Sequence, residues 1–211
     1  MRYKSVFLEL IVLACLQLAA QGLPAYSLAE TESGFSYSVV GEIAILTGYE
    51  GNEAQVSIPE KLGGVPVAAV GEEALAGLSA DSVSLPRSVH VLCSGAFRGA
   101  KMQEVRFSYG LTDICEEAFE GCANLTGAAL PETLISLAGG AFRGCHSLLF
   151  VTIPESVRIE EDPFPDCPLL ATLAMISDHP SLMMAGNKLI SRKDSRVLSV
   201  LSALSPEDAH D

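Results

Sequence analysis

The sequence predicts a repeat solenoid, mainly β or α/β in class, built from about five coils of 22 or 23 residues with a parallel sheet and a hairpin cap at each end. Three observations predict this fold. An anchor motif recurs at nearly constant spacing, apolar columns recur in phase with it, and short segments of alternating polarity precede it.

The anchor motif is Ala-Phe, followed after one residue by Gly and then by Cys or Ala. Its central residues are Leu75, Phe97, Phe119, Phe142 and Phe164. Their spacings are 22, 22, 23 and 22 residues, a regularity typical of stacked structural repeats. The Gly that follows suits a turn with a positive φ angle.

Apolar columns keep the same period as the anchor. Five residues before each anchor lies a branched aliphatic: Val70, Leu92, Ile114, Leu137 and Ile159. Segments such as Val83-Ser84-Leu85 and Val151-Thr152-Ile153 alternate, so their outer residues should point inward and the middle residue outward. Placed side by side at ~4.8 Å, these strands form a parallel sheet along one face. A proline often follows and ends the strand.

Both ends of a solenoid need atypical segments that cover the core. Phe35 to Val39 alternates, Gly41-Glu42 can turn, and Ile43 to Leu46 returns, which predicts an N-terminal hairpin. At the other end, Lys188 to Ser191, a polar turn at 192–195 and Arg196 to Leu201 predict a second hairpin.

The unit from Leu130 to Leu148, an aliphatic-Pro step followed by Ala-Phe-x-Gly-Cys-x-x-Leu, resembles the BspA-like leucine-rich repeats of bacterial surface proteins. The lead-in from Ala44 to Val67 is similar to the first coil of that family. The resemblance covers about Val39 to Met175, and less closely Asn187 to Leu201. It implies a leucine-rich-repeat solenoid with a surface adhesion and protein-binding role, and no catalytic residues.

The first residues resemble an export signal. Arg2 and Lys4 precede an apolar run from Val6 to Leu18, which is too short to favour a membrane span. The best cleavage site follows Ala29. The alternative is lipidation at Cys15, where Val12 to Cys15 forms a loose lipobox. We therefore expect a secreted or cell-surface protein.

The predicted organisation is a signal peptide at 1–29, an N-terminal capping hairpin and first strand at 30–57, repeats at 58–175, a C-terminal capping hairpin at 176–201 and a tail at 202–211. Cleavage removes Arg2, Lys4 and Glu9 and changes the formal charge from −13 to −14. Such an acidic chain opposes binding to nucleic acid, because phosphate contacts need a cationic surface.

Candidate chemistry is sparse. Five cysteines remain after cleavage, in two repeat columns: Cys93 and Cys115, and Cys122, Cys145 and Cys167. They are either buried thiols or include one disulfide between neighbours in a column. The four histidines show no metal-binding spacing, and Asp178-His179 has the character of a loop. Paired acids before alternate anchors indicate a solvated edge more than a calcium site. No cofactor, metal or enzymatic activity is expected.

The outward residues of the predicted sheet are the candidate binding face for an extracellular protein or glycan. They are mostly small, so the expected anchors are Arg106 and Phe150, flanked by Glu104 and Thr152. The alternative is a structural or assembly unit of the cell envelope. An exposed apolar patch on the sheet would favour binding, and one at the caps would favour assembly.

Overall fold

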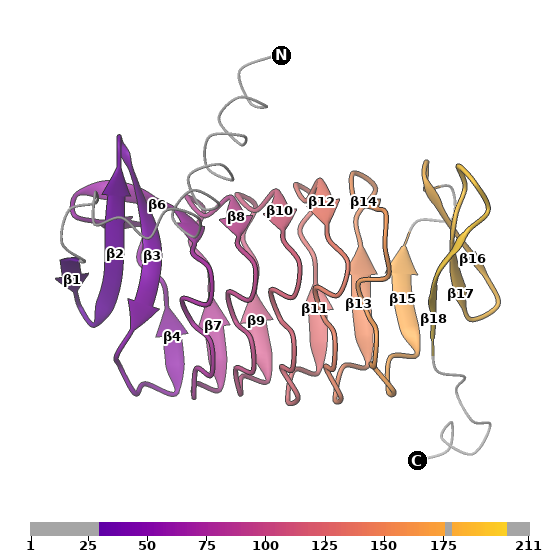
Figure 1. Cartoon of the computed structure of the whole chain (residues 1–211), viewed down its shortest axis with the longest axis horizontal. Helices are drawn as coiled ribbons and strands as arrows, with labels where there is room; N and C mark the ends of the chain where they lie inside the picture. The colour runs from indigo at the N-terminus through magenta and orange to yellow at the C-terminus, as the bar shows by residue number, and fades with distance from the viewer. Residues whose placement is uncertain (1–29, 176–178, 202–211) are drawn as a thin grey trace.

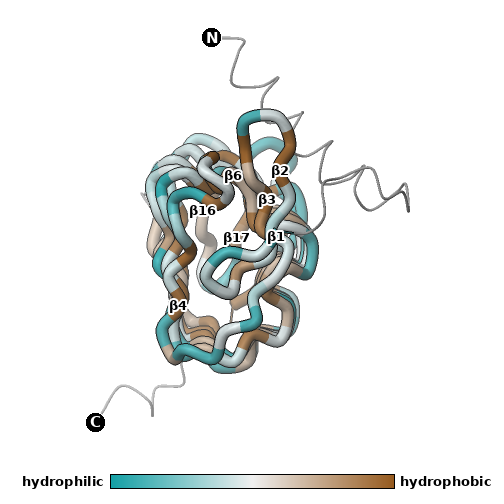
Figure 2. Tube along the Cα trace, turned by 90° about the vertical axis from the view of Figure 1, so that its left-hand side faces the viewer, coloured by the Kyte–Doolittle hydropathy of each residue, from teal (hydrophilic) through white to brown (hydrophobic). Residues whose placement is uncertain are grey.

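The computed structural model describes residues 30–175 and 179–201. These residues form eighteen strands joined by turns and contain no helix, so the described part is all-β. The coils stack along one long axis, with a cap at each end (Figure 1). Viewed along that axis, successive coils lie behind one another around a common core (Figure 2).

The predicted N-terminal hairpin is present. Strand β2 (Phe35–Val40) pairs antiparallel with β3 (Ile43–Tyr49), and β1 (Glu30–Glu32) adds a third strand at the edge. Phe35 and Tyr37 are buried, as their alternation predicted. Strand β3 also pairs in parallel with β6 (Val65–Val70), which itself forms a hairpin with β5 (Lys61–Leu62). This pairing joins the cap to the first coil.

One strand of each coil belongs to a row that we call row A. Its six parallel strands are β4 (Gln55–Ser57), β7 (Ser82–Ser84), β9 (Glu104–Arg106), β11 (Gly127–Ala129), β13 (Phe150–Ile153) and β15 (Thr172–Met175). The central residues, such as Val83 and Val151, are buried and their neighbours face outward. The predicted sheet is divided into two three-stranded sheets, with the break between β9 and β11.

A second parallel row, row B, runs beside row A around the coil and was not predicted. Its short strands are β8 (Val91–Leu92), β10 (Asp113–Ile114), β12 (Ser136–Leu137) and β14 (Arg158–Ile159), which continue the sheet of β6. Each contributes the aliphatic residue of the column that precedes the anchor. The prediction of a single parallel sheet was therefore incomplete.

The anchor residues form a ladder through the core. Phe97, Phe119 and Phe142 are fully buried and stack with ring centroids 5.1 and 5.0 Å apart, nearly parallel. Phe164 continues the stack at 5.8 Å. Each such pair contributes about 0.5–1.5 kcal/mol beyond simple burial. The glycine that follows the anchor has a positive φ, as at Gly99 (66°), which confirms the predicted turn.

The C-terminal cap is a three-stranded antiparallel sheet. Strands β17 (Lys188–Ser191) and β18 (Val197–Val200) form the predicted hairpin, and β16 (Leu182–Ala185) pairs with the other edge of β17. The inner side chains Leu182, Leu189 and Leu198 are buried in the common core. This cap therefore closes the end of the solenoid.

His179, taken from sequence as part of an ordinary loop, is fully buried and fastens this cap to the last coil. Its Nε2 donates a hydrogen bond to the carbonyl oxygen of Pro154 (3.1 Å). Its Nδ1 accepts hydrogen bonds from the backbone N–H groups of Ser181 and Leu182, each at 3.2 Å. His179 does lie in a connecting segment, but no feature of the sequence indicates that its ring is buried and satisfies three backbone groups at this junction.

Candidate binding face

Row A presents two outward columns, in the register that the repeat predicted. The first contains Ser57, Ser84, Arg106, Ala129, Thr152 and Ala174. The second contains Gln55, Ser82, Glu104, Gly127, Phe150 and Thr172. All twelve side-chain positions are exposed or half-buried. The row therefore offers a continuous strip of side chains on a rigid backbone.

In the first half of row A, polar side chains pair with one another. Arg106 Nε lies 2.8 Å from Glu104 Oε1 within strand β9, and both side chains are mostly exposed. The hydrogen bond and charge of Arg106 lower the pKa of Glu104 and correspondingly raise the pKa of Arg106. Ser84 donates a hydrogen bond to Ser57 across the coils (2.9 Å). Two of the four predicted site residues thus already have a partner in each other.

In the second half, an aromatic ring stands out on a surface of small residues. Phe150 is 45% exposed, and its ring lies over Gly127 of the neighbouring coil. A methyl group added at Gly127 would lie only 2.4 Å from the ring carbons. Thr152 sits two residues further along β13, half-buried between Ala129 and Ala174. The glycine therefore makes the room in which the ring lies against the strand.

Two aliphatic residues extend this surface. Leu149 is 50% exposed and Leu169 51% exposed, each just before a strand of row A. The carbonyl oxygen of Leu149 accepts a hydrogen bond from the N–H of Ala171, which brings the two strand starts side by side. We call Leu149, Phe150 and Leu169 the apolar patch. The sequence contained a signal for the two leucines, because the preceding coil has a polar residue at each corresponding position. Thr126 corresponds to Leu149, and Ser147 corresponds to Leu169.

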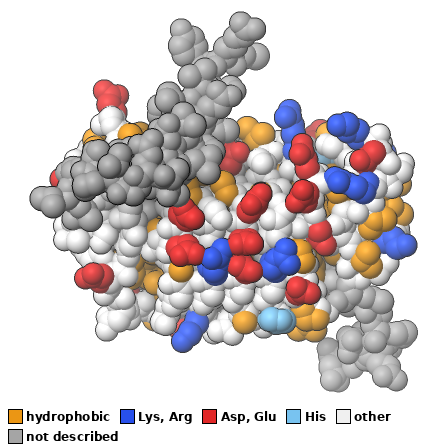
Figure 3. Space-filling view, viewed as in Figure 1, with side chains coloured by type: hydrophobic (Ala, Val, Ile, Leu, Met, Phe, Trp, Pro, Cys, Tyr) orange, Lys and Arg blue, Asp and Glu red, His pale blue; other side chains and the backbone are white. Residues whose placement is uncertain are grey.

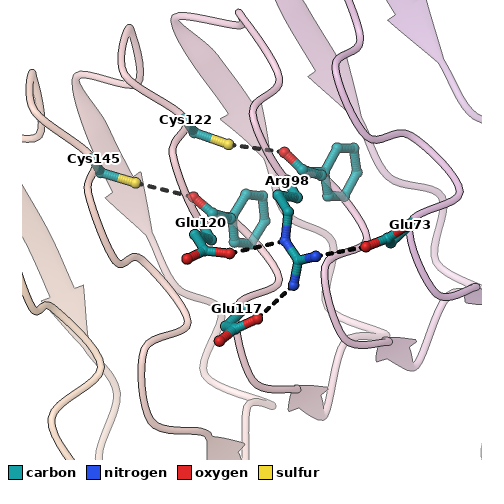
Figure 4. Close-up of polar contacts among 8 residues, drawn as sticks. Glu73, Arg98, Glu117, Glu120, Cys122 and Cys145 are labelled. Carbon is teal, nitrogen blue, oxygen red and sulfur yellow. Dashed lines mark hydrogen bonds and ion pairs between the residues drawn. The ribbon is translucent and has the colours of Figure 1, made fainter.

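A separate strip of the surface, along the turns that contain the anchor motif, is rich in ion pairs. Arg98 bridges three carboxylates, with Nη1 2.6 Å from Glu73, Nη2 2.5 Å from Glu117 and Nε 2.8 Å from Glu120 (Figure 4). The acidic and basic side chains follow one another along the middle of the face in Figure 3. At this exposure each pair stabilises by about 0.2–1 kcal/mol. The strip therefore ties adjacent coils together.

The residue after the anchor is Arg98, Glu120 and Arg143 in three successive coils, and one of the two neighbouring pairs forms an ion pair. The pair Arg98–Glu120 forms, whereas Arg143 makes no ion pair within the described residues.

The column of Cys122, Cys145 and Cys167 is a ladder of thiols. Each Sγ donates to the carbonyl oxygen of the anchor one coil earlier, at 3.1, 3.2 and 3.0 Å. The hydrogen bond to Cys122 and burial raise the pKa of Cys145, and burial raises the pKa of Cys167 to about 12. Such thiols stay protonated at neutral pH and have a structural role. Cys93 and Cys115 lie in the turns after β8 and β10.

Within residues 30–175 and 179–201, no three or more His, Cys, Asp or Glu side chains gather in a way that could hold a metal ion. The same ranges contain no helix with the length and apolar character needed to cross a bilayer.

The comparisons with known proteins agree with this geometry. The profile of the BspA-type leucine-rich repeat region matches residues 56–182 in six copies, the number of strands in row A. No curated protein matches the chain.

Among solved structures, a leucine-rich repeat protein of T. pallidum is 33% identical, with a TM-score of 0.64 over 68% of this chain and 70% of that one. Two more distant structures share the fold. A leucine-rich repeat protein from Bacteroides ovatus is 23% identical, with a TM-score of 0.63 over 70% of this chain and 42% of its own.

The pneumococcal vaccine antigen PcpA is 16% identical, with a TM-score of 0.63 over 86% of this chain and 57% of its own. The family profile covers more than half of the chain, and the T. pallidum protein is similar over two thirds of it. The chain belongs to the family of BspA-type leucine-rich repeat proteins.

Proposed function

We propose that the chain is an exported, non-enzymatic module that binds an extracellular protein through the apolar patch on row A. The observation that carries the proposal is the exposure of Leu149, Phe150 and Leu169 in two neighbouring coils, on a face that is otherwise small and polar. Exposed apolar groups that adjoin one another on a rigid scaffold are typical of protein-binding surfaces. The aromatic ring supplies the kind of anchor that dominates such interfaces.

The two expected anchors are not equivalent. Arg106 would have to give up its pairing with Glu104 before it could pair with a partner, because the two groups already form a hydrogen bond. Phe150 requires no such exchange, since its ring already lies exposed over Gly127. We therefore place the main contact at Phe150 and give Arg106, Glu104 and Thr152 a flanking role. A protein fits this patch better than a glycan, because aliphatic side chains offer a sugar no hydrogen bonds.

Export and surface location are supported by the cationic and apolar start of the sequence and by membership of a family of surface proteins. We expect the mature chain to begin at Glu30. N-terminal sequencing of the protein made by its natural host tests this. A chain that begins with a lipid-modified Cys15 would instead establish the lipoprotein alternative.

A binding screen tests the proposed face. The purified protein is measured against extracellular-matrix proteins, mucin and bacterial-surface proteins, with Phe150→Ser and Tyr109→Ser in parallel. Tyr109 is a matched control, since it is an exposed aromatic residue in the turn after β9 and lies outside row A. The proposal predicts loss of binding in Phe150→Ser alone. Equal binding by both folded variants would contradict it.

A further inference from the structure

The outward face of the C-terminal cap is also apolar. The cross-strand neighbours Met183, Ile190 and Val197 form one outward row, and Ala185, Lys188 and Val200 form the next. Met183, Val197 and Val200 are 37%, 45% and 61% exposed, although they lie in regular strands. Only one of these six side chains is charged. We call these six residues the cap face.

Cations border the cap face. Residues 182–201 contain Lys188, Arg192, Lys193 and Arg196 against a single acid, Asp194. Arg196 donates a hydrogen bond to the carbonyl oxygen of Glu160, which holds the turn against the last coil, and Arg192 Nε donates one to the carbonyl oxygen of Leu182 within the cap (2.8 Å). Lys188 and Lys193 are exposed and have no ion pair within the described residues. Residues 182–201 of an otherwise acidic molecule are therefore basic, although Asp162 and Asp166 of the last coil line the same recess as Val197 and Val200.

The opposite end carries the complementary charge. Residues 30–60 contain six glutamates and neither lysine nor arginine: Glu30, Glu32, Glu42, Glu50, Glu53 and Glu60. All six are exposed. Strands β1 to β3, which carry the first three or flank them, stand at the other extreme of the long axis from β16 to β18 (Figure 1). Segments 30–60 and 182–201, at opposite ends of the solenoid, therefore carry opposite net charge.

We infer that the cap face docks on the acidic N-terminal cap of a second copy of this chain, so that copies associate head to tail. Charge complementarity identifies the occupant, since the acidic surface that suits the basic cap is present on every copy. The exposed valines and Met183 would lose water on docking, which adds to the electrostatic attraction. Two different surfaces at opposite ends make the contact heterologous, so the association continues into short filaments.

This inference does not rest on binding at the apolar patch, since it uses the ends of the solenoid and leaves row A open. It adds an assembly role to the proposed binding role, with several copies presenting row A along one filament. Multivalent presentation would raise the avidity for a surface-bound partner without any new contact.

Sedimentation velocity of the purified protein over a range of concentrations tests the inference. At about 0.05 M salt we expect oligomers that grow with concentration, and at about 1 M salt mainly monomer, because the screening length falls to about 3 Å. Lys188→Glu/Lys193→Glu reverses charge at one end and Glu42→Lys/Glu50→Lys at the other. None of these four side chains forms an ion pair within the described residues. Each double variant should be monomeric.

Two combinations make the test specific to the ends. A mixture of the two double variants should recover the oligomers, since the acidic ends of one variant match the basic ends of the other at both contacts. The quadruple variant, with charge reversed at both ends, should recover the oligomers. Phe150→Ser should assemble like the unaltered chain, which separates this inference from the proposed binding face.

A monomer at every concentration in low salt would overturn the inference, as would oligomers that persist in both double variants. Oligomers lost in the double variants but not recovered in the quadruple variant would also overturn it, because the pairing of the two ends requires the rescue. Circular dichroism of each variant confirms that it is folded before the comparison is made.

Discussion

The two halves of row A share one backbone geometry and differ in what they present. Strands β4, β7 and β9 carry polar side chains that pair with each other, as in Arg106–Glu104. Strands β11, β13 and β15 carry Phe150 over a glycine, and Leu149 and Leu169 are exposed in the segments that precede β13 and β15. The inward residues, Val83 and Val151 among them, are equivalent in both halves. The core thus fixes the scaffold, while the outward columns are free to differ and to acquire function.

The largest effect is expected where both halves share the core. Phe119 stacks on Phe97 and on Phe142 and is fully buried, so Phe119→Ala should lower the free energy of unfolding by about 3–5 kcal/mol. Urea denaturation measures this. Phe164→Ala is the matched control, since Phe164 ends the ladder with one stacked neighbour and should lose less. If Phe164→Ala lost more stability than Phe119→Ala, stacking on two neighbours would not be what makes Phe119 important to the core.

A smaller loss is expected where the second half meets its cap. His179→Ala removes three hydrogen bonds at a buried site and should lower the free energy of unfolding by about 2 kcal/mol, because backbone groups are left without partners. Hydrogen exchange should show the loss concentrated in β16 to β18. The exposed His146→Ala serves as the control and should change stability by less than about 0.5 kcal/mol. An equal loss of stability in both variants would argue against the role of His179 in fastening the cap to the last coil.

Gly127→Ala should separate binding from stability. The added methyl would meet the Phe150 ring at 2.4 Å, and the exposed ring can move aside, so stability should change by less than about 1 kcal/mol. Binding should weaken as it does in Phe150→Ser, since the ring can no longer lie on the strand. The check is to measure both properties on one preparation. Unchanged binding would show that the position of the ring does not matter.

The smallest effect is expected in the first half. Arg106 holds the pKa of Glu104 below its ordinary value of 4.5. The pair therefore stabilises the fold above that value and loses its contribution as the pH falls through the lowered pKa. Arg106→Gln should raise the Glu104 pKa toward 4.5 while ligand binding is retained. An NMR titration of the Glu104 carboxyl checks the shift, and an unchanged pKa would contradict the pairing.

The fold could be predicted because the repeat carries its information in columns. The anchors Phe97 to Phe164 and the alternation at Val83 and Val151 were enough to place row A and its register. Row B was missed because its strands contain two residues, too few for an alternating pattern, and only one aliphatic column marks them. His179 was missed because its partners are backbone groups, which a sequence does not distinguish.

The candidate site was predicted in part. Phe150 was selected as the one aromatic residue in its outward column, and the repeat register placed it correctly on row A. Leu149 and Leu169 were overlooked because they lie outside the strands proper, where an aliphatic residue in a leucine-rich sequence attracts no notice. The pairing of Arg106 with Glu104 depends on side-chain conformation, which the register alone does not determine.

Site-specific photo-cross-linking in cells that make the protein is the most direct test of the claim that the second half of row A is the binding face. One photoreactive residue replaces Phe150 and another replaces Gln55, which occupies the same outward column in the first half and is equally accessible on its strand. We expect a covalent adduct with a second protein from position 150 and none from position 55. Adducts from position 55 alone, or equal adducts from both, would contradict it.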